Sequence, residues 1–86
     1  MSSPAEIKAQ IQGAIEQVQE AMGAVGGAQD RADGAIGAGT AATQDTASSL
    51  PGEALSQWRQ AKDRLDEAVT LFQGGSDSLE QYANTI

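Results

Sequence analysis

The chain has 86 residues, so it forms at most one small domain. Twelve acidic and five basic residues give a net charge of −7, which opposes binding to nucleic-acid phosphates and to anionic membranes. Cysteine and histidine are absent, which excludes disulfides, thiolate nucleophiles and the usual zinc sites.

The N-terminal segment carries no recognisable targeting signal. Its first ten residues, MSSPAEIKAQ, lack the basic and apolar regions of a signal peptide. No apolar run approaches the ~18 residues of a membrane-spanning helix, so no membrane span is predicted. We therefore expect a protein that is either secreted without a cleaved leader or cytoplasmic.

The first predicted helix covers about residues 4–38, or extends as far as 46. Ser3 is placed to cap it, Pro4 suits the first helical position and Glu6 completes a capping box. Its apolar residues advance by alternating steps of four and three, as positions a and d of a heptad do. These seam residues are Ile11, Ile15, Val18, Met22, Val25, Ala32 and Ile36, with Gln29 as the one polar member.

Small residues flank this seam at position g, where they would let a neighbouring helix approach closely. They recur every seven residues as Ala14, Ala21, Ala28 and Ala35. The glycines between residues 13 and 37 fall at outer positions, and each costs ~1 kcal/mol relative to alanine. Either tertiary contacts rescue a helix with small surface residues, or its smooth face receives a second partner, or its middle is frayed.

Residues 39–50 are small and polar and form the predicted connection, and Pro51 suits the start of a second helix. This second helix is expected over about residues 51–86, with a possible kink at 74–75. Its seam residues are Leu55, Trp58, Leu65, Val69, Phe72, Leu79 and Ile86, with Lys62, Ser76 and Ala83 at the remaining seam positions. Its flanking small residues are Ala54, Ala61, Ala68 and Gly75, and Tyr82 closes that series.

Two matched seams joined by a turn-rich segment predict an all-α fold, a two-helix antiparallel hairpin with heptad packing. With the chain reversing near residues 44–48, Ile36 faces Trp58 and Val25 faces Val69. Because a lone hairpin buries only one side of each helix, we expect two hairpins to dimerise into a four-helix bundle.

The acidic residues give no indication of catalysis. Asp30 and Asp33, like Asp63 and Asp66, lie at exposed heptad positions near arginines, where solvated ion pairs explain them. A thin hairpin offers no pocket that would shift a carboxyl pKa. We therefore predict a protein that is not an enzyme, with no catalytic residues, no cofactor and no metal. Trp58 is either a partly buried anchor near the turn or an interface hot spot, and the same alternatives hold for Tyr82.

In length, acidic balance, lack of cysteine and paired heptad helices, the chain resembles the small helical-hairpin proteins of type VII secretion, the Trp-Xaa-Gly family and its looser relatives. The Ala- and Gly-rich composition suits an actinobacterial source. The resemblance implies a non-enzymatic dimer, homomeric or heteromeric, that forms a four-helix bundle exported by an ATPase-driven apparatus. The family's motifs are absent: Trp58 is followed by Arg59 and Gln60, and Ile86 occupies the position four residues after Tyr82, where the family has an acid. A partner would then supply the export signal.

The expected function is a helical-hairpin interaction protein, an exported or chaperone-like partner of the type VII kind that acts as a dimer. Its partner would be a protein, either a further copy in a homo-oligomer or a second helical-hairpin protein, and not a nucleic acid. One alternative is a self-assembling structural coiled-coil module that forms a larger homo-oligomer, fibre or particle. Another is a disordered, stress-protective chain that folds on a partner.

Overall fold

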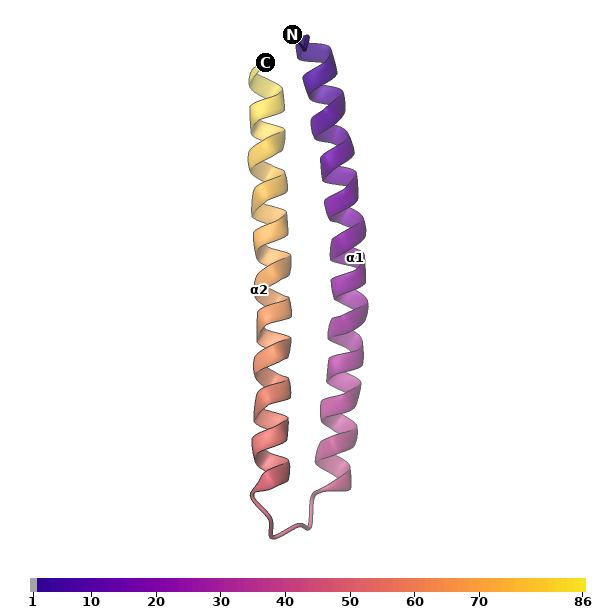
Figure 1. Ribbon diagram of the computed structural model, residues 1–86, viewed down its shortest axis with the longest axis vertical. Helices are drawn as coiled ribbons and strands as arrows, with labels where there is room; N and C mark the ends of the chain where they lie inside the picture. The colour runs from indigo at the N-terminus through magenta and orange to yellow at the C-terminus, as the bar shows by residue number, and fades with distance from the viewer. Residues whose placement is uncertain (1) are drawn as a thin grey trace.

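The computed structural model describes residues 2–86 and consists of two long α-helices joined by a short loop. Helix α1 comprises Pro4–Ala42 and helix α2 comprises Leu50–Thr85. The two helices lie side by side and run in opposite directions, so both termini lie at the same end of the molecule (Figure 1). The resulting rod has dimensions of 66 × 17 × 15 Å. The predicted all-α antiparallel hairpin is confirmed.

Side chains near both ends of α1 satisfy backbone groups that the helix leaves unpaired. At the start, the Oγ of Ser3 accepts a hydrogen bond of 3.2 Å from the backbone N–H of Glu6, which is the predicted cap. At the other end, the backbone N–H and the Oγ1 of Thr43 both donate to the carbonyl of Gly39, at 3.2 and 2.7 Å. The helix therefore extends past residue 38 and ends at Ala42.

Helix α2 begins with a weaker cap. Ser49 precedes it without a side-chain hydrogen bond to the first turn, while Pro51 occupies the second helical position. The Oγ of Ser48 accepts from the N–H of Leu50 at 3.2 Å and so fixes the end of the loop. From there α2 is helical without interruption through Gly74–Gly75, so the structure shows no break at those residues.

The core is a single narrow line of side chains between the helices. Ile15, 2% exposed, and Leu55, 8% exposed, are the buried hydrophobic residues among those that the structure describes. The other aliphatic and aromatic side chains of the seam that are shielded are only half-buried: Ile11, Val18, Met22, Val25, Ile36, Leu65, Val69, Phe72 and Ile86. The hairpin thus buries little apolar surface by itself.

Gly39 allows the helices to approach closely next to the loop. A Cβ at this position would lie 3.0 Å from Cδ2 of Leu55 and 3.2 Å from Cζ3 of Trp58. A Cβ at any of the six glycines between residues 13 and 37 would have no such neighbour within 4 Å. Those glycines border open space in the isolated hairpin and do not serve the packing of α1 against α2.

Candidate interaction surface

The two sides of the hairpin differ in chemistry. In an antiparallel pair of heptad helices, the e positions of both helices lie along one side of the seam and the g positions along the other. The structure shows this division, because Gln12 and Glu80, both at e, line one groove. Ala14 and Gly75, both at g, line a groove on the opposite side. We call the side with the e positions the charged flank and the side with positions g and c the small-residue flank.

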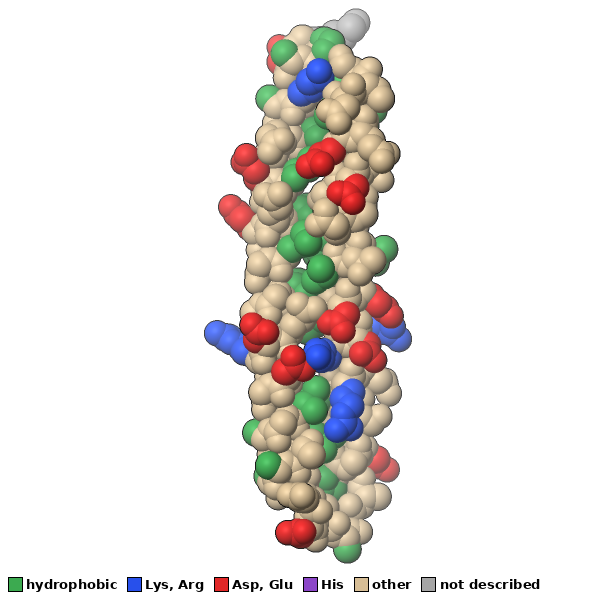
Figure 2. Space-filling model, turned by 180° about the vertical axis from the view of Figure 1, so that it is seen from behind, with side chains coloured by type: hydrophobic (Ala, Val, Ile, Leu, Met, Phe, Trp, Pro, Cys, Tyr) green, Lys and Arg blue, Asp and Glu red, His purple; other side chains and the backbone are tan. Residues whose placement is uncertain are grey.

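Polar contacts between the helices on the charged flank hold them in register. The Nζ of Lys62 lies 2.6 Å from the Oδ1 of Asp33, and the Nε2 of Gln29 donates to the Oδ1 of Asp66 at 2.7 Å. Figure 2 shows acidic and basic side chains from both helices gathered around the middle of this face. These pairings match the register predicted from the apolar seam.

The ammonium group of Lys62 is stabilised in its charged form. Its hydrogen bond with Asp33 and the negative charge of that carboxylate raise the pKa of Lys62 above its ordinary value of 10.5. Desolvation lowers this pKa, while the charges of Asp66 and Asp63 raise it further. The contact therefore favours the protonated lysine over the whole neutral range.

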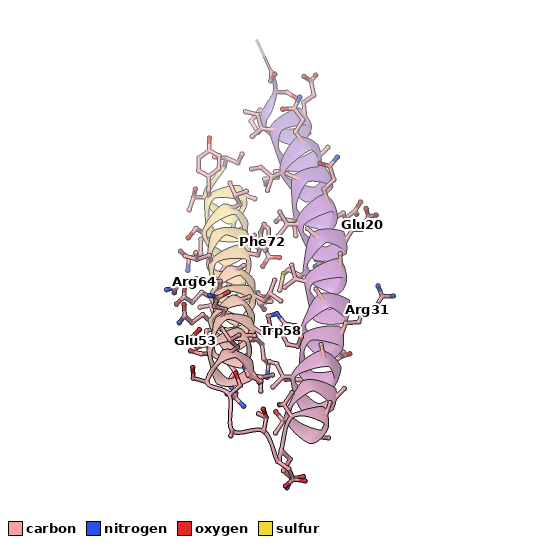
Figure 3. All side chains as sticks on the ribbon, turned by 60° about the horizontal axis from the view of Figure 1, so that its bottom comes forward. Glu20, Arg31, Glu53, Trp58, Arg64 and Phe72 are labelled. Atoms are coloured by element: carbon pink, nitrogen blue, oxygen red, sulfur yellow. The ribbon has the colours of Figure 1, made fainter. Side chains whose placement is uncertain are left out.

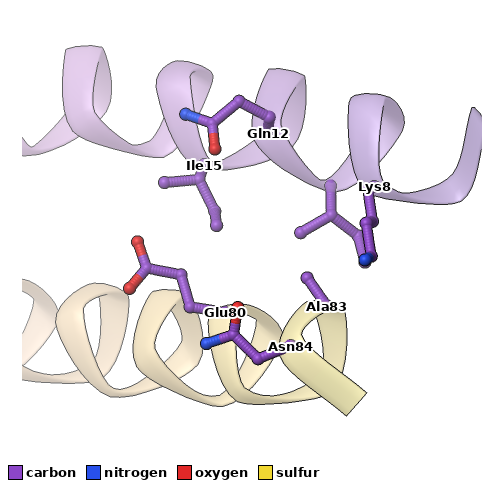
Figure 4. A pocket seen from close by; sticks show the side chains of 7 residues that line it. Lys8, Gln12, Ile15, Glu80, Ala83 and Asn84 are labelled. Atoms are coloured by element: carbon purple, nitrogen blue, oxygen red, sulfur yellow. The ribbon is translucent and has the colours of Figure 1, made fainter. Parts of the chain in front are cut away.

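A shallow hollow of about 340 Å³ lies on the charged flank near the termini (Figure 4). Lys8 and Gln12 border it from α1, and Glu80 and Asn84 border it from α2, around the side chain of Ile15. Lys8 and Glu80 form no ion pair across it. The hollow therefore continues the polar character of this flank along the rod.

The groove on the small-residue flank is apolar. It has a volume of about 290 Å³, with Ala14, Ile15 and Val18 contributed by α1 and Leu71, Phe72, Gly75, Ser76 and Leu79 contributed by α2. Ser76 is only 8% exposed, and its Oγ has no hydrogen-bond partner within the described chain. An unpaired buried hydroxyl is costly, so this groove combines apolar walls with an unsatisfied polar atom.

Large apolar side chains are exposed along one edge of α2. They fall at positions c, d and g and run from the loop to the open end: Leu50 (69% exposed), Trp58 (46%), Leu71 (75%), Leu79 (41%) and Tyr82 (49%). This strip follows the small-residue flank along the full length of α2. Exposed apolar side chains that share one side of a small protein make that side a candidate interaction site.

The predicted close-packing residues also lie mainly on this surface. Ala21 and Ala68 are half-buried, whereas Ala14, Ala28, Ala35, Ala54, Ala61 and Gly75 are exposed. The hairpin therefore does not use most of them to bring α1 and α2 together. They remain accessible to another chain.

Acidic residues are excluded from this flank. All those within the two helices occupy positions b, e or f: Glu6, Glu16, Glu20, Asp30, Asp33, Glu53, Asp63, Asp66, Glu67, Asp77 and Glu80. The charged residues at positions c and g are Arg31 and Arg64, and both side chains point away from the opposite helix (Figure 3). Arg64 is paired with Glu67 at 2.7 Å. The chain's negative charge thus lies on the remaining surface.

Trp58 lies at the boundary of the seam and the small-residue flank. One edge of its ring approaches Gly39, and Figure 3 shows the side chain directed toward the space between the helices. Nearly half of the residue is nevertheless exposed. The side chain therefore covers the loop end of the seam and still has surface free for a partner.

The sequence pattern did not single out Leu50 and Leu71, because both lie at position c and the predicted seam consists of positions a and d. It also missed the cross-helix pairing of Lys62 with Asp33. A charged residue at position a of one helix, level with a residue of opposite charge at position e of the other, would have indicated that pair.

Neither described helix contains an apolar stretch long enough to cross a membrane. Residues 2–86 contain no group of three or more acidic side chains arranged to hold a metal ion. Comparison of the chain with protein-family models, with curated proteins and with solved structures finds no significant match. The assignment of function therefore depends on the surface itself.

Proposed function

We propose that this chain is a non-enzymatic interaction protein, a helical hairpin that acts as a dimer with a second hairpin in a four-helix bundle. Within this proposal it is an exported or chaperone-like partner of the type VII secretion kind. The observation that carries the proposal is the contrast between a core with two buried hydrophobic residues and an apolar strip left exposed along α2. A partner hairpin would remove that strip from water.

The chemistry of the two flanks supports a protein partner. A surface of small and large apolar residues without acidic residues suits packing against another helix. The acidic charge of the remaining surface opposes binding to phosphate backbones. The charged flank would stay in solvent and keep the assembly soluble.

One alternative function is also favoured by a specific observation. Leu50 is exposed beside the loop and Tyr82 near the opposite end, so the apolar strip spans nearly the whole rod. A strip of that length also allows copies to bind in staggered positions, so that each added copy lengthens the assembly. A self-assembling structural module forming a fibre or larger particle would use the surface in this way.

The experiment follows the protein in its source cells with an epitope tag. Chemical cross-linking and mass spectrometry identify its bound partner, and the culture medium is assayed for the chain alongside a marker of cell lysis. We expect a cross-linked species that contains a second hairpin, whether identical or different, and export of the complex without release of the marker. A monomeric chain retained in the cell would contradict the proposal, and an open-ended series of homo-oligomers would favour the structural module.

A further inference from the structure

We propose that the small-residue flank binds the same flank of a second copy of this chain, which identifies the surface and the partner within the dimer proposed above. The inference rests on that proposed function. It commits to one side of the hairpin, formed by positions c and g of both helices, and to a homodimer with two-fold symmetry.

The distribution of charge makes this the side on which two copies can meet. Two chains of net charge −7 repel one another, and packing that brought their acidic residues together would be penalised. The small-residue flank carries no acidic residue in either helix, and its charged residues are Arg31 and Arg64, of which Arg64 is paired with Glu67. Association through it keeps the acidic positions b, e and f of both copies facing solvent or the outer edges.

The shape of the flank is complementary to itself. The large exposed apolar side chains, such as Leu71 and Leu79, all lie on α2. The α1 half of the flank is instead formed largely by alanines: Ala14, Ala24, Ala28, Ala35 and Ala38. Stacking α2 of one copy over α1 of the other places large residues against small ones at both halves of the interface, as two-fold symmetry requires.

The face of the rod that contains the flank is as large as the interface of a stable dimer. A face of 66 × 17 Å has a footprint of about 1,100 Å². A standard protein interface buries about 800 Å² on each partner. The exposed strip of α2 therefore lies within a face of sufficient area.

The groove beneath this strip contains a further indication of an occupant. Ser76 lines it with its Oγ buried and without a hydrogen-bond partner. The opposing α1 of a second copy presents Gln10 and Gln17 at exposed c positions of the same flank. Side-chain amides of this kind donate and accept hydrogen bonds, so they would match the unsatisfied hydroxyl once the Ser76 side chain rotates toward the groove.

The test compares two neighbouring substitutions that add the same charge to α2, one inside the small-residue flank and one about 100° around the helix from it. Leu71→Lys places an ammonium group in the proposed interface, at a residue 75% exposed in the hairpin, so the hairpin itself is spared. Thr70→Lys is the matched control, because Thr70 occupies position b and is exposed outside the flank. Both variants reduce the net charge from −7 to −6, which lessens general repulsion between copies.

Sedimentation velocity over a concentration series measures the dissociation constant of each protein. We expect the wild type and Thr70→Lys to form dimers of twice 8.8 kDa, and Leu71→Lys to dissociate at least about tenfold more readily. Trp58 provides a second readout, since its emission should shift to the red as the wild type dissociates on dilution.

Two results would overturn the inference, and they differ in what they imply for the proposed function. If the wild type and Leu71→Lys dimerised with the same affinity, the dimer would remain but this flank would be excluded as its interface. A wild type that is monomeric at every concentration would exclude the second copy as partner, while a complex with a different hairpin would keep the proposed function.

Discussion

At the level of single residues, Gly39 and Lys62 show how a thin hairpin maintains its register. Gly39 leaves room for Leu55 and the ring of Trp58 beside the loop, where a Cβ would contact both side chains tightly. Lys62 reaches across the seam to Asp33. One residue permits close packing and the other fixes a polar pair, so each can be tested by a substitution with a matched control.

The steric role of Gly39 predicts different outcomes for two glycines of α1. Gly37→Ala should stabilise the protein by about 1 kcal/mol through helix propensity, because nothing lies within 4 Å of the new methyl group. Gly39→Ala gains the same propensity but meets Leu55 at 3.0 Å, and overpacking costs about 1–3 kcal/mol. Thermal melts at one protein concentration should show a higher midpoint for Gly37→Ala than for Gly39→Ala. Equal increases in both would show that Gly39 has no packing role.

The cross-helix ion pair predicts a loss of stability at alkaline pH. Because the pKa of Lys62 is raised above 10.5 in the folded state, its contribution is complete below that pH and disappears as the pH rises through the folded-state pKa. The variant Lys62→Arg keeps its charge in this range, since guanidinium deprotonates only above about pH 12. In urea unfolding between about pH 9.5 and 11.5, the free energy of unfolding should therefore fall more steeply with pH for the wild type than for the variant. Parallel pH profiles would contradict the assignment.

At the level of the helices, the caps and the seam could be predicted because they depend on local spacing. Ser3 caps α1 as its sequence context indicated, and the polar pairs of α1 with α2 follow the register of the predicted seam. The end of α1 at Ala42 could not be placed from the pattern, since it depends on Thr43 bonding back to Gly39. The exposed Leu71 was also missed, because it lies at position c, outside the predicted seam.

The two helix starts predict different sensitivities to removal of a serine hydroxyl. Ser3→Ala should reduce the free energy of unfolding by about 1 kcal/mol, because it removes the acceptor for the N–H of Glu6. Ser49→Ala serves as the control, because its side chain makes no cap hydrogen bond to α2. Chemical denaturation followed by circular dichroism measures both. Equal losses of stability in both variants would contradict the assignment of a side-chain cap to Ser3 and not to Ser49.

At the level of the whole molecule, the seam and the small-residue flank have separate tasks. The seam holds α1 against α2 through a single line of side chains, of which Ile15 is the most buried. The flank leaves Leu71 exposed to solvent, and no acidic residue occupies its positions c and g. A hairpin built in this way gains stability when another chain covers the flank, because binding to the folded form shifts the unfolding equilibrium.

Interrupting the seam should therefore destroy the fold as well as any assembly. Leu65→Asp puts a carboxylate at a half-buried seam position, with an expected loss of about 2–4 kcal/mol, a large share of the stability of so small a domain. Gln60→Asp adds the same charge at an exposed outer position of α2 and should leave helicity unchanged. Far-ultraviolet circular dichroism and sedimentation compare the two. Retention of wild-type mass and melting temperature by Leu65→Asp would disprove the seam assignment.

The central claim is that this hairpin leaves an apolar flank which a second hairpin covers. The most direct measurement is the thermal unfolding midpoint as a function of protein concentration. Unfolding of a dimer separates its chains, so the account predicts a midpoint that rises steadily with concentration, with a mass of twice 8.8 kDa below the transition. A sharp transition with the same midpoint at every concentration and a mass of 8.8 kDa would contradict it.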